Sequence, residues 1–159
     1  MPNVTSGVIG VSLTQTDATP KFTVGTTVQL NDGGQAMYVL SSTSAVSTYA
    51  AVAINADGTV DMLTTTNAAT TPRIGFAQTS IATGFYGWVQ TGGVVKVNLA
   101  ANCDDNVPLF TTGTPGVLDD ATVTAGYVMG LINTVTISNA TAVTCVGQYP
   151  HVGRYGGGA

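Results

Sequence analysis

Two pairs of adjacent aspartates are the residues of this chain whose type and spacing could do chemistry: Asp104-Asp105 and Asp119-Asp120. Paired carboxylates can act as acid and base in glycoside hydrolysis or bind Ca²⁺ through their oxygens. However, Asn102 and Asn106 flank the first pair and Gly116 precedes the second, and Asp is favoured in turns because its side chain bonds nearby backbone. Neighbouring strand residues also point to opposite faces. The pattern favours turns, with a metal site and catalysis as the alternatives.

Other catalytic and metal-binding chemistries find few residues to use. Nucleophilic catalysis of the Ser/His/Asp or Cys/His kind needs an imidazole beside the nucleophile, and the single histidine, His151, precedes a Gly-rich end. A zinc site needs three or four ligands, whereas Cys103 is accompanied only by Asp104-Asp105 and that one histidine. We therefore predict no catalytic, cofactor-binding or metal-binding residue, no cofactor, and no enzymatic activity.

The two cysteines, Cys103 and Cys145, are expected to be buried thiols. The segment Met1–Thr5 lacks the basic region and long apolar run of a secretion signal, so we expect the protein to fold where it is made, in the cytosol, where disulfides are disfavoured. A bridge between the two stays open. The N-glycosylation patterns at Asn3 and Asn139 are expected to be idle for the same reason.

Trp88 lies next to Phe85 and Tyr86, and such a group of aromatic residues has two interpretations. It could form a platform on which sugars stack. Aromatic residues in a Gly-punctuated strand are more often part of the core, and this is the interpretation that we expect to hold.

Charged residues make up only 8% of the 159 residues, with 44% hydrophobic and a net charge of −4. An ordinary soluble domain has roughly 25% charged residues. The bases are only Lys21, Arg73, Lys96 and Arg154, too few and too scattered to neutralise a run of phosphates. The composition therefore argues against nucleic-acid and membrane partners, and it favours a surface that meets other protein over much of its area.

The fold class predicted from the sequence is all-β, with a small β-barrel or β-sandwich body. Val and Thr dominate, Glu is absent and Gly recurs every few residues, a pattern of short strands separated by turns. We expect an extended N-terminal arm over residues 1–20, a β body over 21–149 and a flexible Gly-rich tail over 150–159. No tandem repeat of a solenoid or propeller is found.

The strongest local prediction is a hairpin. Strands over residues 22–30 and 35–40 flank Asn31-Asp32-Gly33-Gly34, residues that tolerate the positive φ of tight turns. Further turns are expected at Asn55–Gly58 and at Thr91-Gly92-Gly93, and a loop at 64–71. The remaining strands are expected over these ranges: 49–54, 59–63, 73–78, 85–90, 94–99, 107–110, 116–118, 127–137 and 142–148.

The order of several short segments resembles a family of tailed-bacteriophage capsid decoration (cement) proteins. The resemblance covers roughly residues 22–132 and leaves the arm and the end of the chain unmatched. The segments that carry it are Phe22–Thr26, Asn31–Gly34, Tyr38-Val39, Arg73–Gln78, Tyr86–Gln90, Val95–Val97, Asn102-Cys103, Pro108–Gly113 and Gly116–Asp120.

This resemblance implies a structural virion protein on the outside of an icosahedral capsid. Members of the family commonly form homotrimers and bridge subunits of the major capsid protein, and the family carries no catalytic residues. The expected partners are therefore the major capsid protein and further copies of this chain, and the expected location is the capsid exterior. The arm at 1–20 is hypothesised to add a strand to a capsid edge. A surface adhesin or carbohydrate-binding β-module, with Trp88 open to solvent, remains the main alternative, and a small hydrolase using the aspartates remains a further one.

Overall fold

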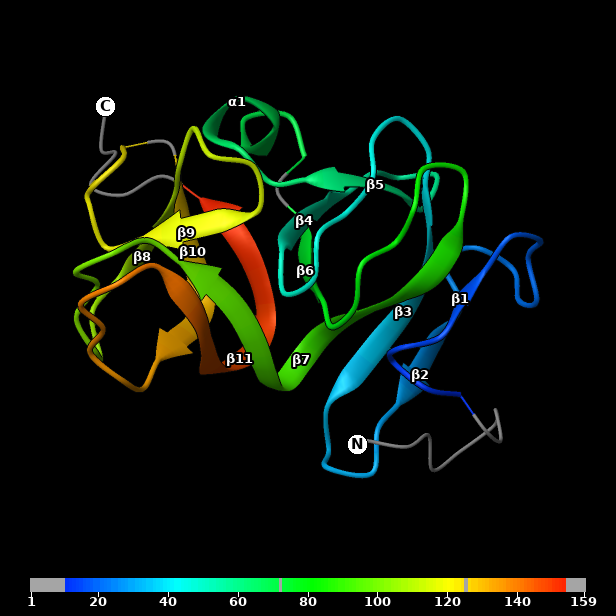
Figure 1. Ribbon diagram of the computed structural model, residues 1–159, viewed down its shortest axis with the longest axis horizontal. Helices are drawn as coiled ribbons and strands as arrows, with labels where there is room; N and C mark the ends of the chain where they lie inside the picture. Colours follow the sequence, from blue (N-terminus) through cyan, green and yellow to red (C-terminus); the bar gives the residue numbers. More distant parts are fainter. Residues whose placement is uncertain (1–10, 72, 125, 154–159) are drawn as a thin grey trace.

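A computed structural model describes residues 11–71, 73–124 and 126–153, and it is built almost entirely of strands (Figure 1). The predicted all-β class is confirmed. No helix in these ranges is long and apolar enough to cross a membrane. In chain order the elements are β1 (Thr16–Asp17), β2 (Thr27–Gln29), β3 (Gln35–Ser41), β4 (Ala51–Ile54), β5 (Thr59–Met62), α1 (Thr65–Ala68), β6 (Ile74–Ala77), β7 (Tyr86–Leu99), β8 (Leu109–Thr111), β9 (Val117–Asp119), β10 (Tyr127–Asn133) and β11 (Thr141–Gly153).

The long strand β7 belongs to two closed circuits of five strands each. In the first, β3 pairs in parallel with β5, and antiparallel pairs then lead from β5 to β4, β6, β7 and back to β3. In the second, β7 pairs in parallel with β9, and antiparallel pairs lead from β9 to β8, β10, β11 and back to β7. Figure 1 shows the result as two lobes that share β7. The body is thus a β-barrel architecture, one of the two predicted forms.

The two circuits repeat the same order of pairings, with equivalent positions about one circuit apart. Leu40 is opposite Thr59 in the first parallel pair and Asn98 is opposite Val117 in the second, so both members advance by 58 residues (98 − 40 and 117 − 59). Gly58 and Gly116, also 58 apart (116 − 58), both have positive φ, 80° and 76°. This structural repeat is not visible in the sequence, because it is carried by backbone pairing and turn geometry.

One buried cluster lies within the first circuit, and a larger one joins strands of both circuits. The first circuit encloses β-branched and small residues such as Val39, Val52 and Val89. The second circuit contributes Val95, Val97 and Leu99 of β7 to the largest cluster, together with both cysteines. Val95, Val97 and Leu99 alternate along the strand with Lys96 and Asn98, so one face of this segment points inward.

The predicted turn at Thr91-Gly92-Gly93 is wrong, because the chain continues through these residues as one strand. Gln35 is opposite Gly92 while Ala36 is opposite Gln90, so Thr91 is an extra residue that forms a bulge. Gly93 has φ +94°, and a Cβ added there would lie 2.6 Å from Cα of Gly34. Glycines are needed here because the backbones of β7 and the β2–β3 hairpin touch, and not because the chain reverses.

The described part of the expected arm packs onto the body. Residues 1–10 lie outside the described ranges. Within 11–20, β1 pairs with β7 (Thr16 opposite Gly87), and Val11 and Leu13 are buried over Trp88. Asp17 accepts a hydrogen bond from the Tyr38 hydroxyl at 3.0 Å and pairs with Lys21 at 2.6 Å. The body therefore begins at or before residue 11, earlier than the predicted boundary at 21.

The end of the body also differs from the prediction. Residues 150–153 complete β11, where His151 is opposite Met129 of β10, so they belong to the sheet and not to a tail. Residues 154–159 lie outside the described ranges. In the expected loop at 64–71, α1 forms because Thr64 and Asn67 make a reciprocal capping box.

The hairpins predicted from Asn/Asp/Gly turns are confirmed. β2 and β3 pair around a turn in which Leu30 N–H donates to Gly34 O, and β4 and β5 pair around Asn55–Gly58. The strands expected at 73–78 and 85–90 are also found, and they pair with each other as β6 and the first part of β7.

The close approach at Gly93 can be tested by adding one methyl group. Gly93→Ala is expected to lower the free energy of unfolding by about 2–4 kcal/mol, from the positive φ and from contact with Gly34. Gly33→Ala is the matched control: its φ is +83° but a Cβ would have open space, so a loss of only about 1 kcal/mol is expected. Urea unfolding measures both, and equal losses would contradict the packing argument.

Candidate interaction surface

The structure brings Asp119 and Asp120 next to Cys103. One ligand atom from each of the three lies within 4.8 Å of the others. Asp104 contributes its backbone, whose N–H donates to Asp120 Oδ2 at 2.9 Å. The Asp105 carboxylate turns away and accepts from the Thr136 hydroxyl at 2.8 Å. The two aspartate pairs thus meet in space, but they do not form one group of facing carboxylates.

The local hydrogen bonds of this cluster are those of turns. Asp119 Oδ1 accepts from the Asp120 N–H at 2.9 Å, and Asn102 and Asn106 on either side of the first pair have φ of 64° and 56°. The expected turn geometry of the first aspartate pair is therefore observed. Because both carboxylates beside Cys103 already accept backbone N–H groups, the cluster ties the 102–106 loop to the end of β9.

The thiol in this cluster is poorly suited to act as a nucleophile. Burial, and then the negative carboxylates of Asp120 and Asp119, raise the pKa of Cys103 to about 11. Reactive cysteines are thiolates, and at neutral pH this one is protonated. Burial likewise raises the pKa of Cys145 to about 12. Both are free thiols in the same core cluster, as expected.

His151 lies at the other end of β11, in an exposed position. Its Nδ1 is 3.1 Å from the backbone oxygen of Tyr149, and it borders a hollow that it shares with Arg73 and Thr91. The residues lining that hollow include neither a carboxylate nor a thiol. The histidine therefore has no partner there with which to form a Cys/His pair or an Asp-supported base.

Trp88 is fully buried, with no exposed surface. Its ring lies 5.3 Å from that of Phe22 and 5.1 Å from that of Tyr38, centroid to centroid, under the segment that contains Leu13. Its indole N–H has no hydrogen-bond partner among the described residues. The core interpretation of Trp88 is confirmed, and a sugar-stacking platform on this residue is excluded.

An exposed apolar row crosses three neighbouring strands of the second lobe. Val94 of β7 is opposite Val146 of β11, and Val146 is opposite Ile132 of β10. Their exposed fractions are 53%, 50% and 53%. Residues directly opposite one another in a sheet have Cβ atoms roughly 5 Å apart, so the three side chains form one continuous ridge on the outer face.

The surroundings of this row are polar but almost uncharged. The next cross-strand pairs on the same face are Lys96 with Thr144 and Asn98 with Ala142. Lys96 is the one charge among these neighbours, and its ammonium lies 5.3 Å from the centre of the Tyr49 ring. The face is therefore a sheet surface with an apolar centre and a rim of hydroxyl and amide groups, the anatomy of a protein-binding patch.

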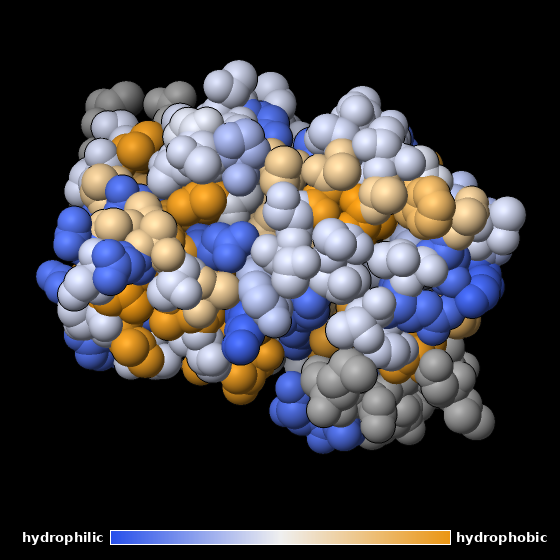
Figure 2. Space-filling model, viewed as in Figure 1, coloured by the Kyte–Doolittle hydropathy of each residue, from blue (hydrophilic) through white to orange (hydrophobic). Residues whose placement is uncertain are grey.

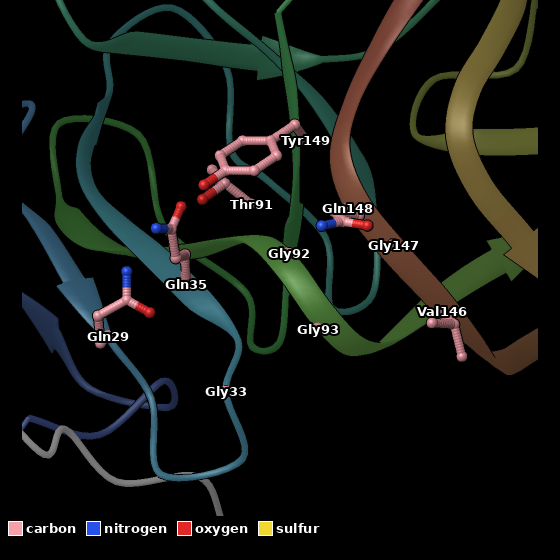
Figure 3. Close-up of a pocket in the computed structure, with 10 residues that line it drawn as sticks. All are labelled: Gln29, Gly33, Gln35, Thr91, Gly92, Gly93, Val146, Gly147, Gln148 and Tyr149. Atoms are coloured by element: carbon pink, nitrogen blue, oxygen red, sulfur yellow. The ribbon is translucent and has the colours of Figure 1, made fainter.

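A groove of about 390 Å³ begins beside Val146 and runs to Tyr149 (Figure 3). Its floor is backbone, from Gly33 and Gly92-Gly93 on one side and Gly147 on the other. Sequence reasoning missed this groove. The available signal was Tyr149-Pro150 at the end of an alternating strand, since a proline inside a strand marks an edge or a bulge.

Comparisons with known proteins found no match for this chain. No family model matches the chain, no curated protein matches it, and no solved structure matches it.

The raised thiol pKa values predict how stability depends on pH. Above about pH 9 the thiols of the unfolded chain lose protons while Cys103 and Cys145 in the folded protein, with pKa values of about 11 and 12, keep them. Their stabilising contribution is complete below pH 9 and is lost as pH rises through these values. The free energy of unfolding should therefore fall above pH 9, by up to about 1.4 kcal/mol per pH unit per thiol.

The control for this prediction is the double variant Cys103→Ala, Cys145→Ala. It should be less stable at neutral pH because it leaves cavities, but its unfolding free energy should fall less steeply above pH 9. The raised pKa of Tyr38, caused by burial, acts in both proteins and cancels in the comparison. Urea unfolding across this pH range gives the two slopes, and identical slopes would contradict the assignment.

Proposed function

We propose that this chain is a structural virion protein that binds the outside of a tailed-phage icosahedral capsid and stabilises it by bridging major-capsid subunits. The observation that carries the proposal is the row of Val94, Val146 and Ile132 on an almost uncharged sheet face. The resemblance of residues 22–132 to capsid decoration proteins supports the same function.

The apolar row supplies the attractive part of such a contact. Burying a Val or Ile side chain completely contributes roughly 1.5–3 kcal/mol, and each member of the row has about half of its surface still to bury. The side chains are β-branched and fixed on paired strands, so ordering them on binding costs little rotamer entropy. A rigid ridge of this kind is suited to a complementary hollow on another protein.

The low charge of the whole surface supports a large, close contact. Eight acids and four bases are spread over the chain, and the face seen in Figure 2 is mostly of neutral hydropathy with small scattered hydrophobic and hydrophilic areas. Hydroxyl and amide groups can be hydrogen-bonded across an interface at much lower desolvation cost than charges. A protein that binds the assembled shell and not its separate subunits shifts the equilibrium toward the shell.

Homotrimer formation is part of this proposal and would take place on the shell. Permanent oligomers have large, strongly apolar interfaces. The described residues expose six large hydrophobic side chains: Phe85, Val94, Ile132, Val135, Val146 and Tyr149. The row of Val94, Val146 and Ile132 is the main apolar patch among them, which is too small for a permanent trimer interface. We therefore infer that copies gather at local three-fold positions because the capsid holds them there.

The structure gives less support to the alternatives than to the capsid function. A carbohydrate-binding module centred on Trp88 lacks its platform, because that ring is buried. A hydrolase would need free carboxylates, whereas Asp119 and Asp120 accept backbone hydrogen bonds beside a protonated thiol.

A single charge in the row tests the proposed function. Val146→Asp should weaken binding to shells assembled from a tailed-phage major capsid protein to which the unchanged protein binds, by more than about tenfold, because a carboxylate would be buried without a partner. Co-sedimentation with the shells gives the affinity, and the thermal stability of the shells gives the functional effect.

Phe85→Asp is the matched control. Phe85 is 37% exposed and lies just before β7, outside the row, so its variant should bind shells like the unchanged protein. Failure of the unchanged protein to bind such shells would contradict the function. Equal binding by Val146→Asp and the unchanged protein would contradict the docking surface.

A further inference from the structure

The groove beside the apolar row is lined by neutral groups that can both donate and accept hydrogen bonds. Gln29, Gln35 and Gln148 project into it from β2, β3 and β11, with Thr91 from the bulge of β7 (Figure 3). None of the described residues that line it is charged. An amide offers two N–H donors and a carbonyl acceptor, and a hydroxyl does both, so these side chains match a ligand made of hydroxyl groups.

These hydrogen-bonding groups are free to take a ligand. Within the described ranges, the side chains of Gln29, Gln35 and Gln148 make no hydrogen bond to protein, and neither does the hydroxyl of Tyr149. By contrast, Gln90 and Gln78 elsewhere on the same sheets bond to the backbone of Val94 and Lys96. The unused amides are thus gathered in the groove.

Tyr149 stands at the rim of the groove in an unusual conformation. Its φ is +46°, in the left-handed region that disfavours tyrosine, and its side chain is 69% exposed. The cause is a bulge: Met129 is opposite His151 and Leu131 is opposite Gly147, so three residues of β11 face Gly130 alone. A Cβ at residue 130 would lie 2.5 Å from the backbone oxygen of Gln148. The bulge can therefore form only because residue 130 is a glycine.

Figure 3 shows the Tyr149 ring near Thr91 and Gln35, at the opposite end of the groove from Val146. These three residues line the first groove and also the second hollow beside it. An exposed aromatic face next to amide side chains is the chemistry that holds a sugar ring, because the apolar face of the sugar stacks on the ring while its hydroxyls bond to the amides.

The backbone of the groove argues against an extended peptide as the ligand. A peptide that adds a strand needs a free row of backbone groups. Here Gly92 is already paired with Gln35 and with Gln148, and Gly93 with Gly147. The binding groups that remain are side chains, and they are neutral.

We propose that the groove is a binding site for a neutral oligosaccharide, with Tyr149 as the stacking platform and Gln35 and Gln148 as its hydrogen-bonding partners. This goes beyond the proposed capsid function. The groove shares Val146 with the row that we propose faces the capsid, so we expect the sugar to bind the free protein and not a shell-bound copy.

The test is binding of the free, full-length protein to an array of short gluco-, galacto- and manno-oligosaccharides, printed beside sialylated and uronic-acid oligomers. Titration calorimetry then gives the affinity for the best neutral sugar. Tyr149→Gly removes the ring and suits the positive φ, so the variant should fold as well as the unchanged protein. It should bind the sugar at least about tenfold more weakly.

Two controls separate the possible outcomes. Phe85→Ala removes an exposed aromatic residue outside the groove and should leave sugar binding unchanged, while Gln148→Ala should weaken it. Tyr149→Gly should still bind capsid shells, because Tyr149 is not part of the apolar row. If the unchanged protein does not bind shells, that result contradicts the capsid function and leaves the sugar site to be judged by sugar binding alone. The sugar site is overturned if no neutral sugar binds, if Tyr149→Gly binds equally well, or if only acidic oligomers bind and Arg73→Gln abolishes that binding.

Discussion

The close contact of two backbones, at Gly34 of the β2–β3 hairpin and Gly92-Gly93 of β7, is the constraint on which the rest of the structure depends. A Cβ on Gly34 would lie 2.7 Å from the Gly92 oxygen and one on Gly93 would lie 2.6 Å from the Gly34 Cα. The contact lets a single strand pass from one five-stranded circuit into the next. Because β7 supplies one strand to each circuit, both cores and the outer face of the second lobe take their positions from it.

The surface features follow from that arrangement. From Gly92 to Leu99, β7 pairs with β11 residue by residue, which places Val94 opposite Val146. The pairing of β11 with β10 then places Val146 opposite Ile132. Gly92 and Gly93 have no side chains, so the neighbouring strands border a groove at this point and not a filled core. The apolar row that we assign to the capsid and the amide-lined groove that we assign to a sugar are therefore neighbours produced by one structural cause.

Much of the fold could be predicted from the sequence, because hairpin turns and alternating strands are local signals. Asn31–Gly34 and Asn55–Gly58 identified their hairpins, and Val95, Val97 and Leu99 identified a buried face. The meaning of Thr91-Gly92-Gly93 could not be predicted in this way. Paired glycines allow either a reversal or a close backbone contact, and only the distant partner Gly34 distinguishes the two.

The site was less predictable, because it depends on register between distant strands. Val94, Ile132 and Val146 are unremarkable in sequence, and pairing alone makes them one row. Asp104 and Asp105 lie in a turn region as expected, whereas Asp119 ends strand β9. The meeting of the two pairs at Cys103 needs the parallel pairing of β9 with β7. Tyr149 is exposed because of the glycine opposite it on β10, a relation that spans two strands.

The most direct test of the central claim is a cryo-electron microscopy reconstruction of capsid shells incubated with this protein. The account predicts ordered density on the outside of the shell, at local three-fold positions, with the outer face of β7, β11 and β10 turned toward the major capsid protein. Shells without added density, or a bound protein whose Val94–Val146–Ile132 row faces solvent, would contradict it.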